Sequence, residues 1–152
     1  NVEEIILPDL SRVRMTYDDS GNVLTRTEAV GLTEQRTVVR EYDDHDRVIS
    51  EETLDGTGAS IDGKMFYEFD SFGNLVAIVD ETGLRTKMVY DDKNRQVAVS
   101  VPGFGTTTYT YNDADELISE VDGEGHEEIW EFDAVGRITF TRDAVGNTAS
   151  YV

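Results

Sequence analysis

Carboxylates are the most frequent groups in this chain that could do chemistry. Its 152 residues include 32 Asp and Glu against 13 Lys and Arg, a formal net charge of −19. Calcium needs about six to eight oxygens that converge from a loop of fixed spacing. Here no glutamate recurs at a set offset, and the first aspartate of each cluster suits turn hydrogen bonding. We therefore predict ordinary turns and no metal site, with loose cation binding as the alternative. The acidic clusters are Asp18-Asp19, Asp43-Asp44-His45-Asp46, Asp91-Asp92 and Asp113-Ala114-Asp115.

The remaining candidates for catalysis are few. His45 and His126 are the only histidines, both fall at predicted turns, and the sequence shows no partner for either. A catalytic triad or a zinc site would need such partners. Paired carboxylates could serve a glycosidase, but no pair stands out among 32 acids. There is no cysteine. We therefore expect no catalytic residue and no cofactor, and we expect that the protein is not an enzyme.

Charge also limits the partners. The acids are spread along the whole chain, so nucleic acid and anionic membranes would be repelled. No apolar run is long enough to span a bilayer, which predicts no membrane insertion.

Aromatic side chains recur at regular intervals and could form a face that stacks on carbohydrate. Packing between neighbouring strands is the interpretation we favour, because repeat units need a large side chain to bury against one another. The recurring aromatics are Tyr17, Tyr42, Tyr67, Phe69, Tyr90, Tyr109, Tyr111, Trp130 and Phe132.

These residues belong to a tandem repeat. One aromatic per unit, the anchor, precedes a turn, and successive anchors are 25, 27, 21, 21 and 21 residues apart. The unit is therefore 21 residues with two insertions, one within Leu32 to Arg40 and one around Asp55 to Gly63. We expect the first to lengthen a strand or add a bulge, and the second to form a loop. The anchors are Tyr17, Tyr42, Phe69, Tyr90, Tyr111 and Phe132.

Turn-forming residues stand at fixed offsets from each anchor. The next residue is an acid or its amide: Asp18, Asp43, Asp70, Asp91, Asn112 and Asp133. Four places after the anchor come Gly21, Asp46, Gly73, Asn94, Asp115 and Gly136. Glycine, asparagine and aspartate tolerate a left-handed backbone best. A second glycine follows ten places later: Gly31, Gly56, Gly83, Gly125 and Gly146, with Gly103 and Gly105 flanking that place in the fourth unit.

Between the turns the pattern alternates with a period of two, as where Trp130 and Phe132 flank Glu131. This period predicts strands, not helices. Two turns in 21 residues leave two short strands, so each unit is a β-hairpin. The predicted fold is all-β, with hairpin repeats in a continuous antiparallel sheet.

The chain resembles the YD repeat in segments such as Tyr17-Asp18-Asp-Ser-Gly21-Asn22 and Phe132-Asp133-Ala-Val-Gly136-Arg137. That repeat defines the bacterial Rhs proteins, the C subunits of insecticidal Tc toxins, wall-associated proteins and the teneurins. The resemblance covers essentially the whole chain. The departures from the YD pattern are mild. Asp46, Asn94 and Asp115 replace glycine, Phe69 and Phe132 replace tyrosine, and Gln96 and Glu116 differ from the residue types usual at their positions.

The resemblance implies a coiled sheet that forms part of a hollow shell, which in toxin-bearing members encloses an effector. Those members also carry a self-cleaving Asp-Pro-x-Gly motif, and this chain has no Asp-Pro pair. We expect a secreted or cell-surface segment whose partners are neighbouring repeats and an enclosed effector. The alternatives are a self-assembling extracellular scaffold or fibre, which would be a homopolymer, and an adhesin or carbohydrate-binding module.

The domain prediction is one repeat array over residues 1–152. It has a partial unit at 1–15 and units that start near 16, 41, 67, 88, 109 and 130, and it stops in mid-unit. Both ends are expected to leave strand edges that pair with further repeats.

Overall fold

The structure is a computed structural model that describes residues 1–8 and 10–151. The described residues form fourteen strands and no helix. The strands are β1 (Val2–Ile6), β2 (Arg12–Tyr17), β3 (Val23–Glu28), β4 (Arg36–Tyr42), β5 (Val48–Asp55), β6 (Met65–Phe69), β7 (Leu75–Val79), β8 (Arg85–Tyr90), β9 (Gln96–Val101), β10 (Gly105–Tyr111), β11 (Leu117–Val121), β12 (Glu127–Phe132), β13 (Ile138–Arg142) and β14 (Thr148–Ser150).

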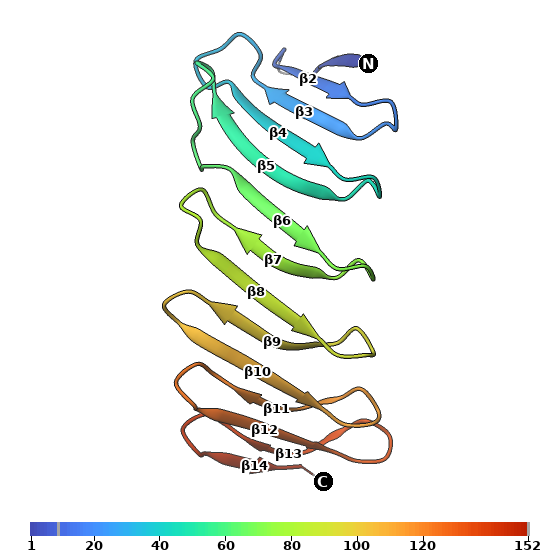
Figure 1. Cartoon of the computed structure of the whole chain (residues 1–152), viewed down its shortest axis with the longest axis vertical. Helices are drawn as coiled ribbons and strands as arrows, with labels where there is room; N and C mark the ends of the chain where they lie inside the picture. Colours follow the sequence, from blue (N-terminus) through green and yellow to red (C-terminus); the bar gives the residue numbers. More distant parts are fainter. Residues whose placement is uncertain (9, 152) are drawn as a thin grey trace. The chain divides into compact units, whose positions relative to one another are not determined.

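The strands have the same order in the sheet as in the sequence (Figure 1). The pairings within the first eighty residues, such as β2 with β3, are antiparallel, as are those further along, such as β12 with β13. This order is a meander of hairpins, in which each strand from β2 to β13 pairs with the strand before it and the strand after it. The predicted all-β, antiparallel hairpin fold is confirmed.

The chain divides into two compact units. One comprises Asn1–Glu68 with Ile78–Leu84, and the other Phe69–Ala77 with Arg85 onward. In the first unit β4 and β5 form the longest pair, with Arg36 opposite Asp55 at one end and Tyr42 opposite Val48 at the other. In the second unit β8 to β14 are five to seven residues long, except β14, which has three.

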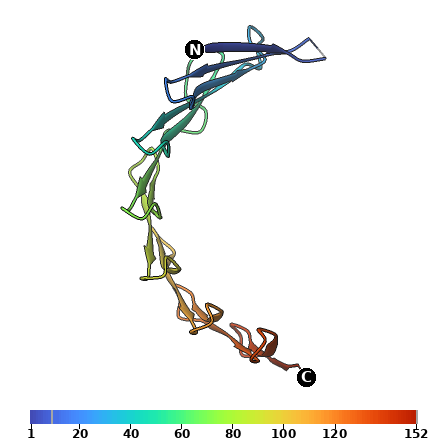
Figure 2. The same ribbon diagram turned by 90° about the vertical axis from the view of Figure 1, so that its right-hand side faces the viewer.

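Within each unit the strands form a single layer, which Figure 2 shows from the side. Among the described residues, only the side chains of Val13, Ala77 and Ser50 are buried. Most strand side chains are half-buried, and in β10 the half-buried Thr107 and Tyr109 alternate with exposed threonines. A single layer has no core between two sheets, so backbone hydrogen bonds and cross-strand side-chain pairs supply most of its stability.

The two insertions are both accommodated between strands. The first forms the connection at residues 29–35, where Leu32 N donates to Ala29 O (2.9 Å) and Gln35 N to Leu32 O (3.2 Å). The expected longer strand is found in part: β4 has seven residues, one more than β8 or β12, and these two consecutive turns take up the other extra residues before it begins. The second insertion is a loop, as expected, between the end of β5 and β6. Within the described chain, no helical segment has the length and hydropathy needed to traverse a bilayer.

Candidate functional site

The most regular feature of the molecule is the turn that follows each aromatic anchor. We call these the anchor turns: residues 18–22, 43–47, 70–74, 91–95, 112–116 and 133–137. In the second of them Asp43 N donates to Arg47 O (3.0 Å) and Asp46 N to Asp43 O (3.1 Å). The Asp43 side-chain Oδ1 accepts from the amides of His45 and Arg47, at 2.9 and 3.1 Å. The same two backbone bonds close all six anchor turns.

The fourth residue of each anchor turn has a left-handed backbone. Its φ is 94° at Gly21, 59° at Asp46, 92° at Gly73, 60° at Asn94, 65° at Asp115 and 80° at Gly136. A type I turn followed by a left-handed residue is a common way to join antiparallel strands through a short loop with a bulge. Register shifts of this kind lie beside the anchors of five turns: Tyr17, Tyr42, Tyr90, Tyr111 and Phe132. The residue types therefore suit the geometry that the turns have.

The turns at the other end of the hairpins are built in the same way. We call residues 55–59, 80–84, 122–126 and 143–147 the return turns, and each starts with an aspartate whose Oδ1 accepts from the amides two and four residues later. Their left-handed glycines are Gly58, Gly83, Gly125 and Gly146.

The glycines nearest the insertions differ from the regular pattern. Gly56 lies in a turn but is not left-handed, whereas Gly58 has a φ of 86°. The reason is that the turn starts at Asp55, and the third residue after that aspartate is Gly58. Gly31, Gly103 and Gly105 are also left-handed, with φ of 80°, 82° and 86°.

In each anchor turn the first and fifth side chains form a pair. Asp43 Oδ2 accepts from Arg47 Nε at 2.7 Å, and Asp91 Oδ2 from Arg95 Nε at 2.8 Å. Asparagine replaces arginine in the turns that begin at Asp18 and Asp70. The turn at 112–116 has the reverse arrangement, which the sequence pattern did not reveal. There Asn112 Nδ2 donates to Glu116 Oε2 at 2.6 Å.

The fifth residue of an anchor turn also reaches the next anchor turn when that turn offers an acceptor. Within the first unit Asn22 Nδ2 donates to Asp46 Oδ1 at 2.6 Å. Within the second, Arg95 Nη1 donates to Asp115 Oδ1 at 2.6 Å, and Asn74 Nδ2 to Asn94 Oδ1 at 2.9 Å. Asp46, Asn94 and Asp115 are the three residues that stand where glycine was expected. Each forms a hydrogen bond between turns that glycine would not, which offsets the cost of a left-handed non-glycine residue.

The anchor tyrosines connect neighbouring hairpins through their hydroxyl groups. Tyr42 Oη donates to Val23 O (2.9 Å), Tyr90 Oη to Leu75 O (3.0 Å) and Tyr111 Oη to Gln96 O (2.9 Å). Each acceptor is the first residue after the preceding anchor turn. The Tyr17 hydroxyl instead donates to Glu3 Oε2 at 2.9 Å. All the aromatic residues that were predicted to pack between strands are half-buried, among them Tyr17, Tyr42, Phe69, Tyr90, Tyr111, Trp130 and Phe132.

These hydroxyl bonds yield a pair of opposite predictions. We expect Tyr90→Phe to lower the free energy of unfolding by about 1 kcal/mol, the usual net value of such a hydrogen bond. Phe132→Tyr is expected to raise it by a similar amount, because the equivalent carbonyl before it belongs to Leu117. Urea unfolding followed by the fluorescence of Trp130 measures both changes. A neutral Tyr90→Phe would show that the hydroxyl bond adds nothing to stability.

Turn hydrogen bonding also alters the acidity of the aspartates. The side chain of Arg47, with backbone amides, lowers the pKa of Asp43 to about 2. Arg95 lowers the pKa of Asp91, and the Arg137 amide and side chain lower that of Asp133. The carboxylates that start the turns therefore prefer the charged form in the folded chain.

The pH dependence of stability follows from that preference. A group whose pKa is depressed by folding contributes stability above its unfolded value, here 3.8 for Asp43, and loses it as the pH falls toward the folded value near 2. We expect the urea midpoint of the wild type to fall between pH 4 and pH 2 in constant salt. Asp43→Asn should show a smaller fall over this interval, since asparagine retains the acceptor but does not titrate. Equal falls in the two proteins would contradict the assignment to Asp43.

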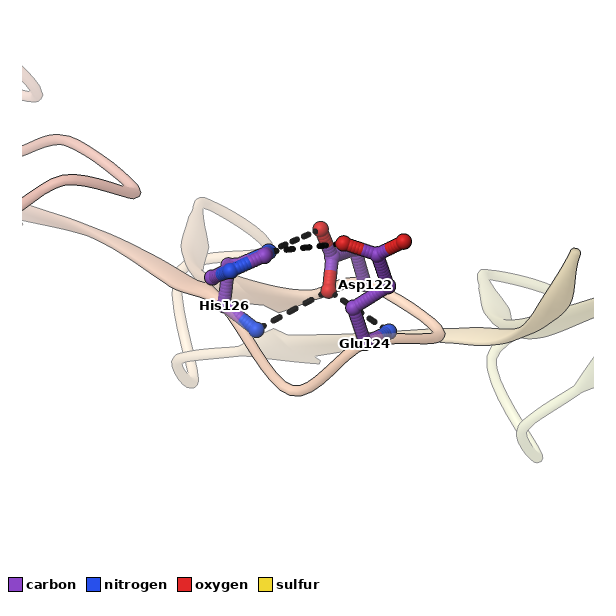
Figure 3. A group of neighbouring side chains, drawn as sticks. All are labelled: Asp122, Glu124 and His126. Carbon is purple, nitrogen blue, oxygen red and sulfur yellow. Dashed lines mark hydrogen bonds and ion pairs between the residues drawn. The ribbon is translucent and has the colours of Figure 1, made fainter.

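The two histidines differ in their surroundings. His45 is exposed, and its backbone amide takes part in the anchor turn. His126 Nδ1 lies 2.9 Å from Asp122 Oδ2 and 3.7 Å from Glu124 Oε2 (Figure 3). The expectation that His126 has no partner was wrong, because its side chain meets that of Asp122 four residues earlier, as the side chain of Asn147 meets that of Asp143. Asp122 raises the pKa of His126 by this contact.

The acidic clusters do not gather into a common site. In three of the clusters the first carboxylate, that of Asp18, Asp43 or Asp91, is engaged by its own turn. The neighbouring Asp19, Asp44 and Asp92 are exposed, as is Asp113, which follows the first residue of its turn, Asn112. Among the described residues, only Asp122, Glu124 and His126 place three ligand-bearing atoms within 4.8 Å of one another.

The geometry defines the class of protein as a single-layer antiparallel sheet of hairpin repeats. No family model matches the chain, and no curated protein does. Solved structures do match: crystal structures of the Tc-toxin proteins TcdB2-TccC3, one of them without the hypervariable C-terminal region, superpose with a TM-score of 0.75 at 13% identity over 90% of this chain. TcdB2-TccC3-TEV gives 0.73 at 15% identity over 89%.

This likeness shows a shared fold, and it confirms at the level of the fold the resemblance to YD-repeat shells. The chain spans about 7% of the length of the proteins it matches.

Proposed function

We propose that the chain is a structural segment of the wall of a secreted or cell-surface YD-repeat shell of the Rhs type, which encloses and delivers an effector. The observation that supports this most is the superposition of 90% of the chain on TcdB2-TccC3. In this proposal the chain has no catalysis of its own, and its partners are neighbouring repeats and the enclosed effector.

The turn and anchor residues would then set the geometry of the wall. The left-handed residues and bulges fix the register of each hairpin, and the aromatic anchors hold each hairpin to the one before it. The hydrogen bonds from Asn22 to Asp46 and from Arg95 to Asp115 add a second connection along the ends of the strands. Repetition of the same turn in each hairpin would then produce an extended surface.

The rival function is an extracellular scaffold or fibre in which sheets of different chains join edge to edge. The observation in its favour is that β1 and β14 each pair with one described strand only. All five residues of β1 are exposed, with Val2 at 70% and Ile6 at 60% of their full accessibility. An edge strand can pair with further repeats, whether of the same chain or of another.

The assembly state of the isolated chain distinguishes the two. Light scattering and electron microscopy should be recorded over a range of salt concentrations, because −19 per chain must be screened before like chains can pack. The shell proposal expects a monomer at high salt as well as at low salt. Extended polymers that lengthen with salt would refute it and favour the scaffold.

A further inference from the structure

The return turn at 122–126, between β11 and β12, carries a glutamate at its third position and a histidine at its fifth that no other return turn has there, beside the aspartate that all four share. Asp122, Glu124 and His126 occupy its first, third and fifth positions (Figure 3). His126 Nδ1 is 2.9 Å from the Asp122 carboxylate and 3.7 Å from that of Glu124. A metal ion bound by nitrogen and carboxylate oxygen, at about 2.0–2.2 Å from each, needs its ligands at separations of this order.

The fold does not require these side chains. The third residue is a threonine, Thr57 or Thr82, in two of the other return turns and Val145 in the last. The fifth is Ala59, Leu84 or Asn147. All four turns nevertheless have the same backbone hydrogen bonds and the same contacts to Oδ1 of the aspartate. Glu124 and His126 are therefore additions to a turn that forms without them.

The turn leaves one oxygen of Asp122 for an ion. Oδ1 accepts from the amides of Glu124 and His126, both at 2.9 Å, so that the carboxylate is fixed in orientation. Oδ2 points to the imidazole. A ligand whose other atoms are held by the surrounding structure loses little freedom when it binds a metal.

The neighbouring turn holds the backbone of this one in place. Gly123 lies directly against Phe104 and Gly105, so closely that a side chain would not fit. On its other side the return turn borders a hollow that is lined by His126, Arg142, Asp143 and Val145. The backbone is thus supported, while the three ligand side chains stay accessible to solvent.

We propose that Asp122, Glu124 and His126 bind a divalent transition-metal ion of the zinc class through Oδ2, Oε2 and Nδ1. The ion binds the neutral imidazole at Nδ1 while Nε2 carries the ring proton, so an imidazolium releases one proton to solvent on binding and a neutral ring releases none. The two carboxylates balance the charge of the ion. Three protein ligands leave the remaining coordination positions to water. An imidazole nitrogen favours zinc, nickel and copper over calcium, which prefers oxygen ligands alone. The site does not depend on the function proposed above.

The test is a titration of the untagged chain with ZnCl2, followed by the NMR signals of the two histidine side chains. We expect the His126 signals to change at well below millimolar zinc while those of His45 change little, since His45 has no such cluster. CaCl2 at the same concentrations should leave His126 unchanged. A zinc response of His45 equal to that of His126, or no response of His126 below millimolar zinc, would overturn the proposal.

Two sets of variants make the test specific. His126→Asn keeps the turn, because Asn147 serves the same position in the last return turn with its Nδ2 2.8 Å from Asp143 Oδ2. Loss of this nitrogen ligand is expected to weaken zinc binding at least about tenfold, with the backbone signals of the turn in place. Val145→Glu together with Asn147→His should create a second site at Asp143. Unchanged affinity in His126→Asn, or a double variant that binds one ion only, would count against the site.

Discussion

Replacing Gly105 by alanine is expected to destabilise the protein far more than the same change at Gly125. The two glycines have nearly the same left-handed φ, 86° and 88°. Alanine therefore carries the same backbone cost at both, about 1–2 kcal/mol. The surroundings differ. At Gly125 nothing lies within 4 Å of an added Cβ, whereas at Gly105 the Cβ would lie 2.8 Å from the Cα of Gly123 and 3.1 Å from its carbonyl oxygen.

Neither of those contacts can be relieved by a rotation of a side chain, since both are with backbone. The strands that carry the two turns would have to separate locally, and overpacking of this kind costs about 1–3 kcal/mol. We expect Gly125→Ala to lower the free energy of unfolding by about 1–2 kcal/mol and Gly105→Ala by about 2–5 kcal/mol.

Urea unfolding of both variants in the presence of a chelator measures the difference without a contribution from bound metal. Circular dichroism before unfolding checks that each variant retains its strands. If the two variants lost the same free energy of unfolding, the turns at 101–105 and 122–126 would not be in close contact in solution.

The fold could be predicted from the sequence because its determinants are local. Asp18 and Gly21, or Asp133 and Gly136, specify a turn within five residues, and the alternation between turns specifies strands. A meander then needs no pairing between distant segments. A shift of one residue would exchange the two faces of a strand, so the regular alternation also constrains the register.

The structure departs from the expected offsets where an insertion changes the count of residues from the anchor. Gly56 stands at the expected offset, but the insertion moves the turn to Asp55, and counting from that aspartate would have indicated Gly58. At 29–35 the left-handed Ala29 opens the connection with a φ of 51°. Alanine gives no signal of that conformation in a sequence.

The contacts of His126 were foreseeable in part. Asp122 precedes it by four residues, the separation at which Asp43 meets Arg47 and Asp91 meets Arg95. The pattern of first and fifth residues in the turns was therefore a usable signal for this contact. The hydroxyl bond from Tyr90 to Leu75 O was not foreseeable, because it depends on how adjacent hairpins are offset.

The reversed pair Asn112 and Glu116 is expected to behave as a unit. In the other anchor turns an acid at the first position faces an arginine or asparagine at the fifth, and here an amide faces an acid. Asn112→Asp alone would place two carboxylates against each other in a half-buried turn. We expect it to lower the free energy of unfolding by about 1–2 kcal/mol, because a charge-assisted hydrogen bond is replaced by repulsion.

Glu116→Arg alone should also destabilise, since the Asn112 amide then faces a cation that has no acceptor to offer it. The double variant reproduces the pair that Asp91 and Arg95 form, with Nε and Oδ2 2.8 Å apart. We expect it to recover most of the wild-type stability, which corresponds to a coupling energy of about 1–3 kcal/mol between the two positions.

A double-mutant cycle at neutral pH and moderate salt gives that energy directly. Ala114→Ser serves as a control in the same turn, because its exposed side chain takes no part in the pair, and it should be neutral. Additive losses in the double variant would show that positions 112 and 116 act independently, and that the first and fifth side chains do not stabilise the turn by their contact. Recovery would instead show that either polarity of the pair closes the turn, because both polarities place a donor of one side chain against the carboxylate of the other.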